Sequence, residues 1–112
     1  MKEITWTDFE KVELRVGKIV SVENFSEAIK LSYKLKVDFG SKIGIKKSSA
    51  QITDMYHPND LLNKLVVAVI NFPTKKIGPY ISECLVTGFH NVHGEVALCV
   101  PDKDIPLGTK LL

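Results

Sequence analysis

The side chains best suited to bind a ligand stand together in one stretch of the chain, residues 65–89. Asn71 follows six apolar residues, and its amide offers donors and an acceptor to a base edge or a peptide backbone. The same side chain is also suited to cap the turn before Pro73. Lys75 and Lys76 come shortly afterwards. Such a pair either contacts phosphate without base selectivity or is simply solvated.

Three further side chains in this stretch extend the candidate site. Phe72 directly follows the apolar strand, so we expect it to be exposed and able to stack on a base or line an apolar pocket. Ser82 and Glu83 begin the next strand and lie on opposite faces of it. A carboxylate in a groove repels phosphate and suits peptide amides or basic side chains. Glu83 either pairs with Lys75 or Lys76 or is an acid in the groove, and as a groove acid it favours a polypeptide ligand over a nucleic acid.

A second group of cations lies earlier in the chain. Residues 30–47 contain six lysines and a single acid. Lys34, Lys36 and Lys47 are predicted to point outward from a hairpin, and Ser49 follows them. The hairpin is either a solvated sheet face or a docking surface for anions. Ser49 either contacts a ligand or caps the short helix expected after it.

Catalytic and metal sites are poorly supported by the sequence. The chain has no glycine-rich phosphate loop, no nucleophile elbow and no pair of carboxylates with catalytic spacing. His90 and His93 with Cys84 and Cys99 lack the Cys-x-x-Cys spacing typical of zinc sites. Both cysteines stand in apolar runs, which predicts buried free thiols in a reducing compartment. We therefore expect a protein that is not an enzyme and binds no metal or cofactor.

Length and composition predict one globular domain spanning residues 1–112. An apolar fraction of 45% and a charged fraction of 25% are those of an ordinary globular protein. A chain of this length can bury roughly 65% of its unfolded surface without disulfides or metals. No apolar run approaches the roughly 20 residues needed to span a bilayer, and the first residues lack an apolar signal core. We expect a cytoplasmic protein without membrane insertion.

The first half of the chain predicts a short helical turn and a long bent strand. Thr7 and Glu10 have the spacing of a capping box, which predicts one helical turn over residues 8–11. Residues 12–22 form the first strand, whose even-numbered apolar residues are expected to face the core. Gly17 stands in the middle of this strand, where glycine usually marks a bulge or bend. A small barrel needs such a bend because its first strand pairs with both halves of the sheet.

The middle of the chain predicts a hairpin, a helix and a buried strand. Strict alternation over residues 33–39 predicts the second strand, and residues 43–49 the third. The apolar spacing within residues 50–64 changes to that of a helix, and Pro58 is expected to end it. The fourth strand, residues 65–70, is apolar on both faces and must therefore be covered on both.

The remaining residues complete the predicted fold. Residues 81–89 form the fifth strand and residues 95–100 a further one. Five strands with a short helix between the third and fourth predict an all-β oligonucleotide-binding (OB) barrel. The apolar segments at the two ends of the chain exceed what this barrel needs. They are candidates for a dimer interface.

Several separated motifs resemble a known family. The chain resembles the tRNA-binding domain appended to aminoacyl-tRNA synthetases, and more closely the stand-alone CsaA proteins. The resemblance covers nearly the whole chain, in Asp8-Phe9-Glu10-Lys11, Leu14-Arg15-Val16-Gly17, Val37-Asp38-Phe39-Gly40, Lys47-Ser48-Ser49-Ala50-Gln51-Ile52-Thr53, Asn71-Phe72-Pro73, Ser82-Glu83-x-Leu85-Val86-x-Gly88 and Pro106-x-Gly108-Thr109-Lys110.

This resemblance implies an OB barrel, a homodimer and no catalysis. CsaA proteins are export-related chaperones that bind unfolded preproteins and the secretion ATPase, whereas the tRNA-binding domains recognise tRNA shape. We therefore expect a chaperone for protein export that binds extended or unfolded polypeptide, with tRNA binding through the lysine-rich face as the alternative. The expected ligand contacts are Asn71, Phe72, Lys75, Lys76, Ser82, Glu83, Lys34, Lys36, Lys47 and Ser49.

Overall fold

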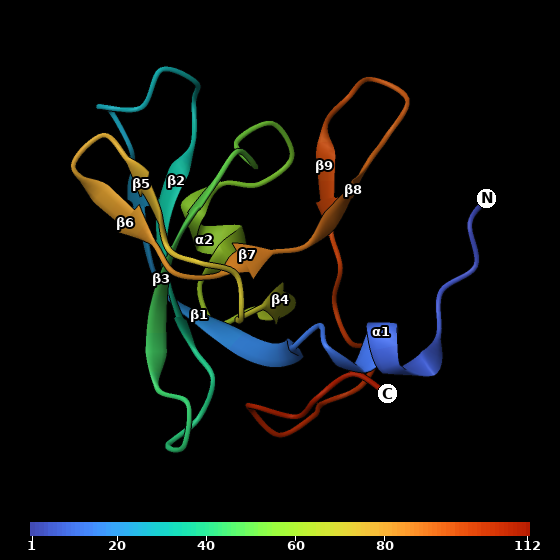
Figure 1. Ribbon diagram of the computed structural model, residues 1–112. Coiled ribbons are helices and arrows are strands. Elements are labelled where there is room, and N and C mark those ends of the chain that lie inside the picture. The colour runs from blue at the N-terminus through green and yellow to red at the C-terminus, as the bar shows by residue number, and fades with distance from the viewer.

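The computed structural model describes residues 1–112 and shows a small β-barrel with two short helices (Figure 1). Five antiparallel strands hydrogen bond in the order β3-β2-β1-β4-β7 and curl into a nearly closed barrel. This arrangement confirms the predicted all-β, five-stranded OB-type fold. The barrel strands are β1 (Leu14–Asn24), β2 (Tyr33–Asp38), β3 (Ile45–Ala50), β4 (Leu65–Val69) and β7 (Leu85–Val86).

Strand β1 pairs with β2 along one part of its length and with β4 along the other. The predicted bend at Gly17 is wrong, because the register shifts between Ile19 and Ser21, which makes Val20 the extra residue of a β-bulge. The predicted facing is only partly right before this bulge, where even-numbered Val16 is buried as predicted but odd-numbered Ile19 is fully buried as well. Gly17 serves close packing instead: a Cβ atom there would lie 2.5 Å from Val37 Cγ1.

Strands β2 and β3 form the hairpin that the alternating pattern predicted. Tyr33, Leu35 and Val37 are buried, while Lys34 and Lys36 point away from the core. Regular antiparallel pairing with β3 runs along all six residues of β2. The hairpin therefore presents its lysines on the outer face of the barrel.

Helix α2 (Pro58–Leu61) lies between β3 and β4, as expected for this fold. The prediction that Pro58 ends a helix is wrong, because it occupies the first helical position. Proline is well suited to that position, since its missing N–H would have no intrahelical partner there. Leu61 is fully buried and fills one end of the core.

Helix α1 (Trp6–Glu10) begins earlier than the predicted turn. The capping box is formed by Thr5 and Asp8, whose side chains each accept a hydrogen bond from the backbone N–H of the other residue. The predicted pair, Thr7 and Glu10, lies inside the helix instead. Both pairs have the same spacing, so the sequence pattern did not distinguish them.

The predicted fifth strand, residues 81–89, is divided among three short strands because its pairing partner changes twice. Strand β6 (Tyr80–Ser82) forms a hairpin with β5 (Lys75–Ile77). Strand β7 pairs with the end of β4, and β8 (Gly88–His90) pairs with β9 (Val96–Leu98). The β5–β6 hairpin was not predicted, and it forms one wall of the site described below.

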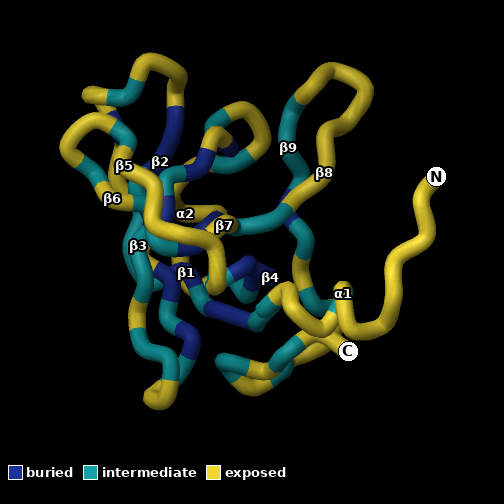
Figure 2. The backbone as a smooth tube through the Cα atoms, in the orientation of Figure 1, coloured by how far each residue is buried: buried dark blue, intermediate teal, exposed yellow.

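The core lies inside the barrel and is built mainly from residues of β1, β2, β3, β4 and α2, with Leu98 of β9. Strand β4 is buried on both faces, as its continuous apolar run predicted. In contrast, the first twelve residues, the β8–β9 hairpin and the C-terminus are largely exposed and lie to one side of the barrel (Figures 1 and 2). Neither helix is long or apolar enough to cross a membrane.

Candidate ligand-binding groove

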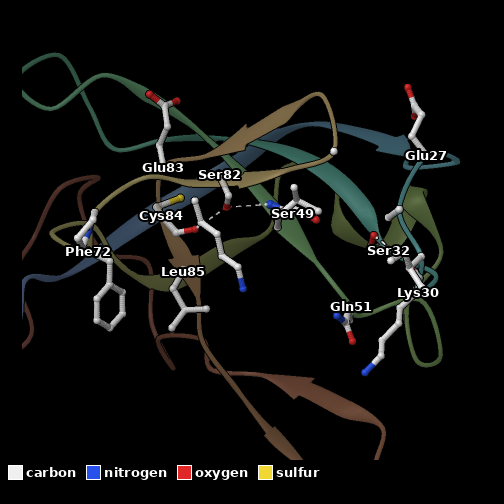
Figure 3. A pocket seen from close by; sticks show the side chains of 16 residues that line it. Glu27, Lys30, Ser32, Ser49, Gln51, Phe72, Ser82, Glu83, Cys84 and Leu85 are labelled. Carbon is white, nitrogen blue, oxygen red and sulfur yellow. Dashed lines mark hydrogen bonds between the residues drawn. The ribbon is translucent and has the colours of Figure 1, made fainter.

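A groove of about 940 Å³ opens beside the barrel, between the β1–β2 loop and the segment that joins β4 to β7 (Figure 3). One wall is the loop between β1 and β2, residues 25–32, and the other includes the β5–β6 hairpin. Ser49 and Gln51, from the end of β3 and the residues after it, line the groove between these walls. The corresponding loops and strands form the ligand-binding face in OB folds generally.

The structure brings half of the sequence-predicted contacts into this groove. Ser49, Phe72, Lys75, Ser82 and Glu83 line it. Five others, which belong to β2, β3, β5 or the connection after β4, do not line it: Lys34, Lys36, Lys47, Asn71 and Lys76.

Glu83 and Ser82 also close the barrel between β3 and the start of β7. The Glu83 N–H donates to the Lys47 carbonyl at 2.7 Å, and its carboxylate accepts from the Lys47 N–H at 3.0 Å. The Ser82 hydroxyl accepts from the Ser49 N–H at 3.2 Å. These side chains replace ladder hydrogen bonds that β3 lacks at its open edge. The Glu83 carboxylate is therefore engaged within the protein.

Cys84 continues this seam into the core. The buried Ser48 hydroxyl donates to the Cys84 carbonyl at 2.9 Å. Burial raises the pKa of the Cys84 thiol to about 11. Both cysteines are free, and Cys84 is buried, whereas Cys99 is half-buried. Cys84 thus forms an apolar part of the groove lining.

Asn71 links the segment between β4 and β5 to the N-terminal segment. Its side-chain oxygen accepts from the Glu13 N–H at 3.0 Å, and its side-chain nitrogen donates to the Lys11 carbonyl at 2.7 Å. These contacts use one acceptor position and one donor of the amide. The second amide hydrogen and an oxygen lone pair stay free, since Asn71 is exposed.

Lys34 and Tyr80 join the β1–β2 loop to the β5–β6 hairpin. The Lys34 ammonium lies 5.0 Å from the Phe25 ring centroid, 5.5 Å from that of Tyr80 and 3.5 Å from the Glu27 carboxylate. Phe25 and Tyr80 themselves stack edge to face at 5.6 Å. A hydrogen bond to its own backbone and the charge of Lys34 lower the pKa of Glu27. Lys34 thus holds the loop against the hairpin.

The remaining predicted lysines are exposed to solvent or nearly so. Lys36 lies directly opposite Lys47 across the β2–β3 hairpin, so two like charges face each other there. The Lys47 ammonium lies 5.4 Å from the Tyr80 ring centroid. Lys75 and Lys76 are both exposed, and neither makes an ion pair or a side-chain hydrogen bond.

A polar network that the sequence did not predict fixes both ends of the chain to the barrel. The Glu13 carboxylate contacts the Arg15 guanidinium at 2.7 Å and the Lys110 ammonium at 2.6 Å. Arg15 also donates to the Gly108 carbonyl at 2.9 Å. Hydrogen bonds from Arg15 and Lys110 lower the pKa of Glu13. No local pattern connects residues so far apart, so only the folded structure reveals the network.

The described chain contains no group of three His, Cys, Asp or Glu side chains close enough to hold a metal ion. The groove instead offers apolar side chains, free ammonium groups, hydroxyls and the Gln51 amide. This chemistry binds ligands and supplies no nucleophile with an adjacent base.

Comparison with known proteins agrees with this geometry. A family model described as "Putative tRNA binding domain" matches residues 14–110. The crystal structure of the CsaA chaperone protein from Picrophilus torridus superposes with a TM-score of 0.91 at 50% identity, covering 98% of this chain and all of that one. The chain belongs to the CsaA family of tRNA-binding-domain proteins. Chaperone CsaA from Bacillus anthracis str. Ames gives a TM-score of 0.92 at 40% identity, covering 99% of this chain and 100% of that one.

Synthetase relatives share only this domain. The methionine--tRNA ligase of Pyrococcus furiosus is 38% identical over 112 residues, which are 99% of this chain and 15% of the ligase. The chain therefore spans about a sixth or less of the curated relatives it matches. The CsaA structures, in contrast, are matched along their full length.

Proposed function

We propose that the protein is a non-catalytic, CsaA-type chaperone that binds extended or unfolded polypeptide in the groove. The observation that carries this proposal is the groove itself. Its lining combines apolar side chains with hydroxyl and amide groups that can pair with a peptide backbone. The full-length likeness to two CsaA chaperones supports the same function. The clients would be unfolded preproteins in the cytoplasm, with the secretion ATPase as a further partner.

The proposal includes a homodimer. Large apolar side chains are exposed at both ends of the chain and on the β8–β9 hairpin, which lie to one side of the barrel (Figure 1). Trp6 and Phe89 are each 70% exposed, and Leu112 is 98% exposed. An apolar surface of this kind is typical of an interface with another protein. A monomeric mass by light scattering at micromolar concentration would refute the dimer.

Suppression of aggregation tests the chaperone function. A denatured client is diluted into buffer with and without the protein, and light scattering is followed over time. Phe72→Ser should weaken the protection, because Phe72 lines the groove and is 56% exposed. The matched control is Ile45→Ser, since Ile45 is 58% exposed and does not line the groove. Equal protection by wild type and Phe72→Ser would count against the groove as the client site.

Binding of tRNA is the second candidate function. The observation in its favour is the like-charged pair Lys36 and Lys47, which face each other without an intervening acid. The synthetase relatives support it as well. Filter binding of tRNA should then weaken steeply with salt, with a slope that falls by about one for each phosphate-contacting lysine removed. Lys36→Ala tests this slope, and Lys103→Ala, on a remote loop, is its control.

A further inference from the structure

The two acids that line the groove are both occupied by contacts within the protein. The Glu83 carboxylate accepts from the Lys47 N–H at 3.0 Å, and the Glu27 carboxylate pairs with the Lys34 ammonium at 3.5 Å. Figure 3 shows both carboxylates pointing to one side, whereas Lys30 and Gln51 point to the other. The fold thus neutralises or turns away the negative charge that the sequence places here.

The two lysines that line the groove are free. Lys30 lies on the β1–β2 loop and Lys75 on the opposite wall, on β5. Both are exposed, and their ammonium groups make no ion pair and no hydrogen bond. Two unpaired cations on facing walls produce a positive potential in the space between them.

Apolar side chains stand next to each of these cations. Ile29 precedes Lys30 on the loop, and Ile77 lies two residues from Lys75, so it shares a face of β5 with it. Phe72 and Leu85 continue the apolar lining, and each is about half exposed. A ligand that matches the groove therefore has apolar side chains interrupted by a negative charge.

We propose that the groove selects apolar segments of unfolded polypeptide that carry an aspartate or glutamate, with Lys30 and Lys75 as the residues that determine this preference. The proposal rests on the polypeptide-binding function given above and specifies its substrate class. The Gln51 amide and the Ser49 hydroxyl, which line the groove between the walls, are placed to pair with the peptide backbone. A basic segment is disfavoured because it would face the two ammonium groups.

Three peptides of matched sequence test the preference. All three have acetylated and amidated ends, a fluorescent label and the same apolar and polar residues outside two central positions. Those two positions hold Glu in the first peptide, Gln in the second and Lys in the third. Fluorescence anisotropy at low salt measures the Kd of each. Wild type should bind the Glu peptide about three- to thirtyfold tighter than the Gln peptide, from two partly exposed ion pairs. The Lys peptide should bind most weakly.

A charge-matched pair of variants assigns the preference to the two lysines. Lys30→Gln/Lys75→Gln should abolish the preference for Glu and leave the affinity for the Gln peptide within about twofold. Lys42→Gln/Lys103→Gln removes the same net charge from exposed loops outside the groove and should retain the preference. Circular dichroism confirms that all variants are folded.

The outcomes separate this proposal from the one on which it rests. Failure of wild type to bind any of the three peptides would refute the polypeptide-binding function and the preference together. Equal binding of the Glu and Gln peptides would refute only the preference. If Lys30→Gln/Lys75→Gln kept the preference but lost affinity for tRNA, the two lysines would serve phosphate, and the proposal would be wrong.

Discussion

Replacing Glu83 separates its role in closing the barrel from a role in binding. In Glu83→Ala the Lys47 N–H, which is part-buried, loses its 3.0 Å side-chain acceptor, while the backbone bond between the two residues persists. An unsatisfied buried donor of this kind costs about 1–3 kcal/mol of unfolding free energy. With an m-value of about 1.5 kcal/mol/M, the urea midpoint should fall by about 0.7–2 M.

Glu83→Gln is the informative partner of that variant. Its amide oxygen still accepts from the Lys47 N–H but carries no charge, so stability should stay within about 1 kcal/mol of wild type. Asp54→Ala controls for the loss of an exposed acid without hydrogen bonds. Unfolding is followed by circular dichroism at one fixed protein concentration, because dimerisation would couple stability to concentration.

Two results would contradict this reasoning. A Glu83→Ala midpoint equal to that of Asp54→Ala would show that the seam between β3 and β7 does not depend on the carboxylate. A large loss of affinity for the Lys-containing peptide in Glu83→Gln, at unchanged stability, would show that the charge acts on the ligand. Glu83 would then be a groove acid, as its position in the sequence first indicated.

Three further substitutions or conditions probe the rest of the structure. Gly17→Ala should destabilise the protein by about 1–3 kcal/mol or prevent folding, because its Cβ would lie 2.5 Å from Val37 Cγ1; urea unfolding measures this. Hydrogen bonds from Arg15 and Lys110 lower the pKa of Glu13, so the stabilisation it provides is present above pH 4.5 and is lost as the pH falls through its lower folded pKa. Glu13→Gln should therefore weaken the dependence of the unfolding free energy on pH in that range, as measured by urea unfolding at several pH values. With a pKa of about 11, Cys84 should react with iodoacetamide at pH 8 about a hundredfold more slowly than a free thiol, as measured by mass spectrometry.

The periodicity of apolar residues predicted the barrel strands well where one face of the strand is buried and the other is exposed to solvent. Strand β2 alternates along its whole length, and its side chains point as the pattern indicated. Strand β4, apolar throughout, is buried on both faces. In β1 the same reasoning was only partly right, because the extra residue at Val20 shifts the facing by one position, so that odd-numbered Ile19 before it and even-numbered Val22 after it both pack against the core. A bulge shifts register without a change in composition, so periodicity cannot locate it.

Turn and helix signals were recognised, but their direction was ambiguous. A proline can follow the end of one helix or occupy the first position of the next, so Pro58 marks a helix boundary without showing on which side the helix lies. The buried residue Leu61, which follows Pro58, settles the sense, since it anchors α2 in the core. The apolar run of residues 81–89 likewise indicated strand correctly, but its pairing partners depend on segments far away in the chain.

The charge available to a ligand in the groove could not be predicted from residue types alone. It depends on which charged side chains form hydrogen bonds or ion pairs within the protein. By sequence, the candidate stretch has lysines and an acid, and the acid pointed to a peptide rather than phosphate. In the structure Glu83 completes the barrel and Lys34 joins the two walls, so neither charge is free. Lys30 and Lys75 stay unpaired, and Lys30 had not been predicted to contact a ligand.

The groove can therefore be positive and still prefer polypeptide, because its cations are embedded among apolar side chains rather than arrayed along a phosphate track. Contact with successive phosphates needs several cations in a row, which describes the outer face of the β2–β3 hairpin better than the groove. The Lys36 and Lys47 pair lies on that outer face and does not line the groove. If both ligand classes bind, they should use these two surfaces without displacing each other. Competition between tRNA and the Glu-containing peptide would show that one surface serves both.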